Sequence, residues 1–107
     1  MEILDMKCAE CGSKIGATLE EALITKSLGV LQEDGVYAFF LYLKTKKGPG
    51  EKIKESAFDF LELEKTASLE VVREKFKDNL DALLFAKELL ERTLVYARYH
   101  AKAIGGE

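Results

Sequence analysis

The chain has 107 residues and a formal net charge of −3, with 48% apolar and 33% charged residues. This balance predicts a single folded domain over residues 1-107 with a modest core, and argues against disorder. A mildly acidic chain is not typical of a protein whose main partner is nucleic acid. No apolar run reaches the roughly 18 residues that span a bilayer, and no secretory leader opens the sequence. We therefore expect a soluble, cytoplasmic protein without a membrane partner.

The amide side chains are strongly depleted. Asn79 is the only asparagine and Gln32 the only glutamine, whereas lysine and glutamate are abundant. This composition is typical of hyperthermophiles and predicts a thermophilic origin. Because intracellular disulfides are tolerated in such organisms, composition leaves the redox state of the two cysteines open.

The first segment, residues 1-17, contains the only sequence pattern that indicates a particular chemical function. Cys8 and Cys11 are separated by two residues and followed directly by Gly12. This spacing predicts a tight turn, or knuckle, in which Gly12 adopts a positive φ and two thiolates face a metal ion. The same residues, with Lys14, resemble the first knuckle of the zinc-ribbon family, and the resemblance implies structural zinc.

A closed zinc site needs four ligands, and the chain has no third cysteine. Four alternatives remain open. Zinc is shared with Cys8 and Cys11 of a second chain, or the cysteines are vestigial or disulfide-bonded. In the third alternative, His100 or a carboxylate completes a metal site within the chain. In the fourth, the two cysteines act as a redox-active pair. Redox pairs usually sit at a helix N-terminus, which the sequence places later, at Thr18.

Two helices are predicted next, each with its own end signals. Thr18 and Glu21 match a capping box, and Gly29 matches a C-terminal glycine, which predicts a helix over residues 19–28 and a connector over 30–35. The aromatic-rich run 36–43 fits either a helix or a strand. Its lysine-rich end, followed by Gly48 and Pro49, favours a buried helix.

The second half of the chain is predicted to be helical throughout. An apolar stripe at helical spacing covers residues 51–64, and Ser68 is a suitable N-cap for the next helix. From Leu69 onward the stripe continues almost to the end, and one unbroken helix would be about 54 Å long. We expect either a break near Asn79 or a long helix shared with a second chain. The fold class is therefore all-α, a bundle of four to five helices over residues 18-107.

The long stripe also predicts an interface. It offers more apolar surface than a chain of this length is expected to bury alone, and an α-helical homodimer would cover the excess. The residues expected to line either the core or the dimer seam are Leu80, Leu83, Leu90 and Leu94.

Basic residues give a rival prediction. A segment with five lysines lies beside Tyr42 and could contact phosphates, although the favoured interpretation is a lysine-rich helix end and loop that keep the surface soluble. These lysines are Lys44, Lys46, Lys47, Lys52 and Lys54. A second basic patch contains Arg92, Arg98, His100 and Lys102, in which His100 is expected to be a surface residue near a helix C-terminus.

A second resemblance concerns residues 34–44, together with 86–88 and Arg98. These segments resemble the small all-helical subunit of archaeal type III CRISPR effector complexes. The resemblance implies a non-catalytic subunit packed along a guide-RNA filament. That family has a helix where this chain has its Cys8–Cys11 segment, so no residue roles are transferred.

The sequence therefore predicts a non-catalytic scaffold or protein-interaction module, homodimeric, with zinc between subunits as its one possible cofactor. No carboxylate pair, nucleophile–base pair or glycine-rich phosphate loop indicates an enzyme. The alternative function is a small nucleic-acid-binding subunit of a ribonucleoprotein complex that uses the lysines of residues 44–54.

Overall fold

The computed structural model describes residues 3–18 and 20–105, and every regular element within these ranges is an α-helix. The all-α prediction is confirmed, although these ranges contain six helices rather than four to five. The additional helix occupies the segment predicted to form the knuckle. In chain order the helices are α1 (Leu4–Gly16), α2 (Glu21–Asp34), α3 (Val36–Lys44), α4 (Pro49–Phe60), α5 (Glu70–Phe76) and α6 (Leu80–Ile104).

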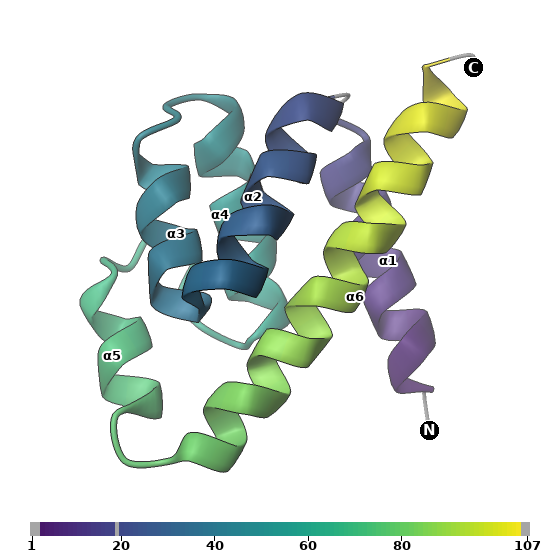
Figure 1. Cartoon of the computed structure of the whole chain (residues 1–107). Coiled ribbons are helices and arrows are strands. Elements are labelled where there is room, and N and C mark those ends of the chain that lie inside the picture. Colours follow the sequence, from purple (N-terminus) through teal and green to yellow (C-terminus); the bar gives the residue numbers. More distant parts are fainter. Residues whose placement is uncertain (1–2, 19, 106–107) are drawn as a thin grey trace.

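Helix α6 organises the bundle. Figure 1 shows it crossing the molecule diagonally, with α1 passing behind it and α2, α3 and α4 grouped on one side of it; α1 contacts both α6 and α4. The short helix α5 lies at the edge of that group and leads through a bend into the first turn of α6. The N-terminal segment is therefore part of the bundle rather than a separate knuckle ahead of it.

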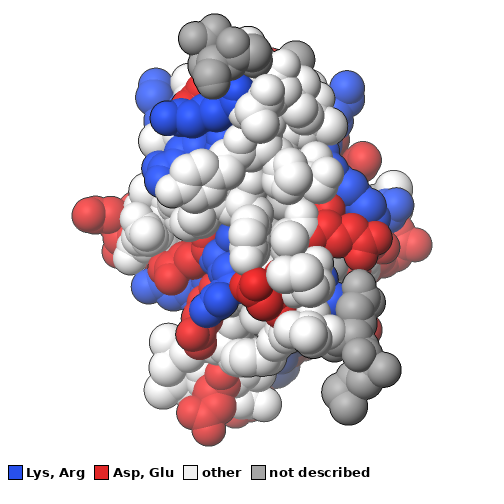
Figure 2. Space-filling view, turned by 90° about the vertical axis from the view of Figure 1, so that its right-hand side faces the viewer, with Lys and Arg blue, Asp and Glu red and all other residues white. Residues whose placement is uncertain are grey.

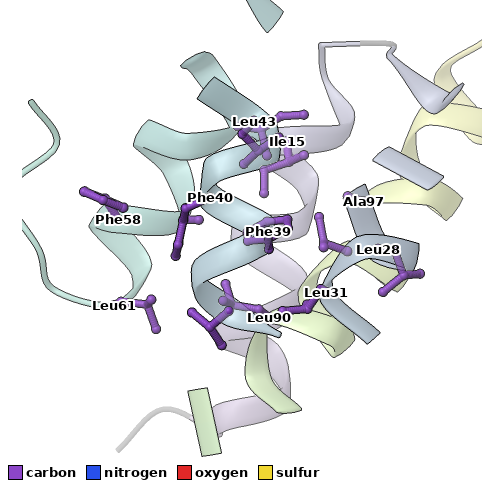
Figure 3. Packing of buried hydrophobic residues seen from close by; sticks show 14 of the residues in the cluster. Ile15, Leu28, Leu31, Phe39, Phe40, Leu43, Phe58, Leu61, Leu90 and Ala97 are labelled. Atoms are coloured by element: carbon purple, nitrogen blue, oxygen red, sulfur yellow. The ribbon is translucent and has the colours of Figure 1, made fainter. Parts of the chain in front are cut away.

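Helix α3 is the centre of the core, as predicted for the aromatic run. Phe39, Phe40 and Leu43 are all fully buried. Figure 3 shows Phe39 and Phe40 pointing to different sides of α3, with Phe40 directed toward Phe58 of α4. The two rings meet edge to face, with 4.9 Å between their centroids. A helix that is buried on more than one side has apolar residues outside a single stripe. The sequence of this helix therefore lacks a clear helical pattern, which is why it also fitted a strand.

The end of α2 was predicted wrongly. Gly29 lies inside α2, which continues to Asp34 because Leu28 and Leu31 extend its buried stripe. The predicted connector over residues 30–35 is therefore helical up to its last residue. Gly35, with φ of 98°, makes the turn into α3.

Two predicted N-caps do not form. The Thr18 hydroxyl donates to the carbonyl oxygen of Ile15 at 2.8 Å, and α2 has Glu20 as its N-cap without a side-chain hydrogen bond. Leu19, the predicted first residue of this helix, lies outside the described residues. Helix α5 has Leu69 rather than Ser68 as its N-cap. Neither helix start therefore has a side-chain hydrogen bond at its N-cap.

Helix α4 begins after a short turn that follows α3, and it ends earlier than predicted. Gly48 has φ of 87°, and Pro49 fills the first turn of α4, where its missing N–H costs nothing. The helix ends at Phe60 rather than Glu64, and Glu62 adopts a positive φ of 63° in the following turn. A loop over residues 61–69 then leads to α5.

The long apolar stripe is broken at Asn79, as one of the two predicted alternatives required. Asn79 is the N-cap of α6, not the C-cap of the preceding helix: its Oδ1 accepts a hydrogen bond from the Ala82 amide at 3.0 Å. Further along α6, the Lys87 ammonium donates to the Gln32 carbonyl oxygen at 3.3 Å. It thereby satisfies a carbonyl in the last turn of α2.

Candidate protein-interaction surface

The Cys8–Cys11 segment is a helical turn, so the predicted knuckle is wrong. Both cysteines lie within α1, and both are buried as free thiols. The Cys8 thiol donates to the Leu89 carbonyl oxygen and the Cys11 thiol to the Ser56 carbonyl oxygen, each at 3.7 Å. The two sulfurs therefore face different neighbours, α6 and α4, instead of one metal ion.

Gly12 serves close packing rather than a turn. A Cβ atom at Gly12 would lie 2.7 Å from the Thr93 carbonyl oxygen, and one at Gly16 would lie 2.7 Å from the Ala97 carbonyl oxygen. Cys8, Gly12 and Gly16 are spaced four residues apart, so they form one stripe of small side chains on α1. This stripe lets the backbones of α1 and α6 approach closely.

Burial determines the chemistry of the thiols. Desolvation raises the pKa of Cys11 to about 12, so this thiol stays protonated at neutral pH. A protonated, buried thiol is a poor nucleophile and a poor metal ligand. Among the described residues, no three His, Cys, Asp or Glu side chains are grouped closely enough to hold a metal ion. Zinc shared between chains stays a prediction that this arrangement does not favour.

A polar network joins α1 to the middle of α6. Asp5 accepts hydrogen bonds from the Tyr96 hydroxyl at 2.8 Å and from the Arg92 guanidinium at 2.9 Å. These two donors, Tyr96 first, lower the pKa of Asp5. On the side of the molecule formed by α1 and α6, Figure 2 shows uncharged surface interrupted by neighbouring positive and negative side chains. Arg92 forms an ion pair with Asp5 at 2.9 Å, so Arg92 is not a free cation of a basic patch.

The four predicted interface leucines divide into two pairs. Leu90 and Leu94 are buried in the core of the single chain, so they belong to the core and not to a dimer seam. Leu83 is half-buried, and Leu80 is 66% exposed. Of the four predicted leucines, those in the first turns of α6 therefore stay available for another molecule.

An apolar hollow of about 270 Å³ lies beside these turns. Side chains of α3, α5 and α6 line it, and its exposed wall area is almost entirely apolar. The lining residues are Tyr37, Val72, Arg73, Phe76, Lys77 and Leu83. Arg73 lies over the Tyr37 ring at 5.9 Å from its centroid, so the cations form the rim while the apolar groups form the floor. We call this hollow, with Leu80 and Leu84, the α5–α6 corner.

Sequence reasoning missed Leu84 and Phe85, which are each 53% exposed. Phe85 lines a second hollow on the other side of α6, together with Leu4 and Cys8. The signal was present in the run Leu83-Leu84-Phe85. Three consecutive large apolar residues cover about 200° of a helix, more than one core-facing stripe. At least one of them had to face another surface.

The five predicted nucleic-acid lysines also divide. Lys44, Lys46, Lys47 and Lys52 are exposed, but Lys54 is only 9% exposed. The Lys54 ammonium donates to the carbonyl oxygens of Lys65 and Ala67 at 2.8 and 2.9 Å, which holds the 61–69 loop against α4. Lys54 is therefore not a freely exposed lysine like the other four.

The second basic patch is less available than predicted. Lys102 pairs with Glu21 at 3.6 Å, and His100 is half-buried on α6 where Gly16 of α1 approaches its Cβ atom. His100 therefore takes part in packing α1 against α6 rather than lying free on the surface.

The fold and this surface define the protein as an all-α helical bundle with an uncovered apolar corner. Within the described ranges, none of the helices combines the length and apolar character that crossing a membrane requires. Comparisons with protein-family models, curated proteins and solved structures found no match to this chain.

Proposed function

We propose that this protein is a non-catalytic interaction module that pairs with a second copy of itself through the α5–α6 corner. The observation that carries the proposal is that Leu80 and Leu84 are exposed in the first turns of α6, the same turns that contribute Leu83 to an apolar hollow. Large apolar side chains gathered at one exposed place mark surfaces that bind other proteins. The lining offers almost no polar wall for substrate chemistry, which supports binding rather than catalysis.

The corner is self-complementary, which is why a second copy fits it. A two-fold axis requires one surface to carry both halves of every contact. This corner has projecting leucines on α6 and a hollow between α3 and α5 to receive them. It also has both charges, because Arg73 and Lys77 line the rim while Asp81 is exposed in the first turn of α6.

The existing ion pairs leave these charges able to change partners. Arg73 pairs with Glu70 at 3.4 Å and Lys77 with Glu74 at 3.2 Å, and all four side chains are more than half exposed. Such exposed pairs contribute at most about 1 kcal/mol. A partner carboxylate at the rim of the hollow therefore competes with them readily. The proposed pairing needs no metal ion, because the leucines and charges of the corner supply its contacts.

Charge reversal with mixing tests the pairing. Lys77→Glu and Asp81→Lys each create two like-charge contacts across the two-fold axis, and each alone should weaken self-association about tenfold. Mixing the two variants should restore wild-type association, because opposite charges then face each other between chains. Sedimentation velocity measures four samples: the two single variants, their mixture, and a chain that carries both changes. Restored association only when both changes are in one chain would indicate an effect within the chain and contradict the proposal.

A second candidate function is supported by the exposed lysines. Lys44, Lys46, Lys47 and Lys52 lie where α3 ends and α4 begins, and no carboxylate within the described ranges forms an ion pair with them. A cluster of unpaired cations is the feature that binds nucleic-acid phosphates. Retention on single-stranded RNA or DNA should then fall steeply with salt concentration and be lost when these four residues become glutamine. Retention that ignores salt would exclude this function.

A further inference from the structure

We infer that a hollow between the end of α3, the first turns of α4 and the 66–69 segment binds a phosphate group. The hollow has a volume of about 200 Å³ and both cationic and hydroxyl side chains in its wall. Its lining residues are Phe40, Lys44, Glu51, Lys54, Thr66, Ala67, Ser68 and Leu69. The α5–α6 corner shares none of them, so this site is independent of the proposed pairing.

Lys54 is the group that points to an anion. Its ammonium lies 4.4 Å from the centroid of the Phe58 ring, and the residue as a whole is only 9% exposed, so most of the side chain is withdrawn from water. It has three N–H donors, and two of them are taken by the Lys65 and Ala67 carbonyl oxygens. Glu51 Oε2 is 4.0 Å away, too far for a hydrogen bond. One donor of a desolvated cation is therefore left for a ligand in the hollow.

The other polar groups of the hollow complete an anion site. Lys44 adds a second positive charge, and Ser68 adds a hydroxyl that can donate. Glu51 is the single carboxylate in the wall, so the three charged side chains carry a net charge of +1. The Glu51 side chain is 57% exposed, so it is free to swing toward solvent when an anion approaches Lys54.

Phosphate fits these donors better than a carboxylate does. A carboxylate is planar and is best matched by the fork of an arginine, whereas lysine binds phosphate as a point charge. Lys44, Lys54 and Ser68 come from three separate segments, and a tetrahedral group presents acceptor oxygens in several directions at once. The phosphate comes either from a small phosphorylated molecule or from the backbone of a nucleic acid.

Titration with inorganic phosphate tests the site. Phosphorus NMR should show saturable binding at millimolar concentrations, and Lys44→Gln should weaken it about fivefold, the effect of one nearby charge. Glu51→Gln should strengthen it by a similar factor, since it removes the only carboxylate. Lys54 is left unchanged because it holds the 61–69 loop. Lys52→Gln is the matched control, since this exposed lysine of α4 does not line the hollow.

The outcomes separate a built site from a diffuse positive charge. Equal weakening by Lys44→Gln and Lys52→Gln, or no strengthening by Glu51→Gln, would overturn the inference. A parallel titration with a single-stranded oligonucleotide identifies the source. If Glu51→Gln strengthens both, the phosphate belongs to nucleic acid; if it strengthens inorganic phosphate alone, the phosphate belongs to a small molecule. A variant that abolishes pairing, Leu80→Glu with Leu84→Glu, should bind phosphate like the wild type.

Discussion

The two halves of α6 have different neighbours although their sequences look alike. From Leu90 onward the helix packs against α1 and α2, and its inward-facing residues Leu90, Leu94 and Ala97 are buried, whereas Tyr99 and Ile104 remain exposed. In the first turns, Leu80, Leu84 and Phe85 are more than half exposed. One helix therefore combines a half that stabilises the fold with a half that is available to another molecule. The comparison teaches that an unbroken apolar stripe does not distinguish core from interface.

The largest expected difference between the halves is in stability. Leu90→Ala should lower the free energy of unfolding by about 2–5 kcal/mol, because it leaves a cavity in a closed core. Leu80→Ala should change it by no more than about 0.5 kcal/mol, because the side chain is mostly solvated. Urea unfolding followed by circular dichroism, at a concentration where the chain is monomeric, measures both. Similar losses for the two variants would remove the distinction between the halves.

The close contact of α1 with the second half of α6 can be broken at Gly12. Gly12→Ala should destabilise the protein by about 1–3 kcal/mol, because the new methyl group meets the Thr93 backbone. Gly29→Ala is the matched control in α2, where a Cβ atom would meet nothing within 4 Å. That change should stabilise the protein by about 0.5–1 kcal/mol. Thermal melts compare the two; a harmless Gly12→Ala would contradict the close packing.

The attachment of the first half depends on the Asn79 cap. Asn79→Ala removes the hydrogen bond to the Ala82 amide and should cost about 1 kcal/mol. Helix α5 is anchored by two buried residues, Val72 and Phe76. We therefore expect the lost stability to appear locally, as faster amide hydrogen exchange in α5 and in the first turn of α6. Asn79→Asp keeps an acceptor at the cap and serves as control. Equal acceleration throughout α6 would show that the two halves unfold together.

The smallest expected effect concerns pH. Hydrogen bonds from Tyr96 and Arg92 lower the pKa of Asp5 below its usual value of 3.8. A carboxylate with a lowered pKa stabilises the fold above its unfolded-state pKa, and this contribution is lost as the pH falls through its folded-state pKa. Asp5→Asn should therefore reduce the drop in melting temperature between pH 5 and about 3. Glu10→Gln, at an exposed position of the same helix, should reduce it less.

Local signals in the sequence were sufficient where the structure is locally determined. The lysines, Gly48 and Pro49 correctly indicated a helix at the aromatic run, and Asn79 correctly indicated a break. Gly29 misled because a glycine inside a helix is tolerated when the buried stripe continues past it. The sequence could not reveal the neighbour of a residue far along the chain. Cys8 and Gly12 resembled a metal knuckle because their packing partner, α6, lies some eighty residues later.

The candidate site shows the same limit. Leu80 and Leu90 both belong to the apolar stripe, and the positions of the other helices decide which of the two is covered. In the sequence, Lys54 cannot be distinguished from the four lysines near it. In the structure, its ammonium donates to two carbonyl oxygens of the 61–69 loop. Spacing along the chain identifies side chains that could form a binding surface. Tertiary packing decides which of them remain available to bind a partner.

Native mass spectrometry of the untagged protein, before and after chelation, tests the central claim most directly. We predict a metal-free dimer that survives chelation, and a folded monomer for the Leu80→Glu, Leu84→Glu double variant. Ile104→Glu, at the exposed far end of α6, should remain dimeric. A dimer that contains zinc and dissociates on chelation would assign pairing to Cys8 and Cys11. A wild-type monomer, or a double variant that still dimerises, would contradict pairing through the α5–α6 corner.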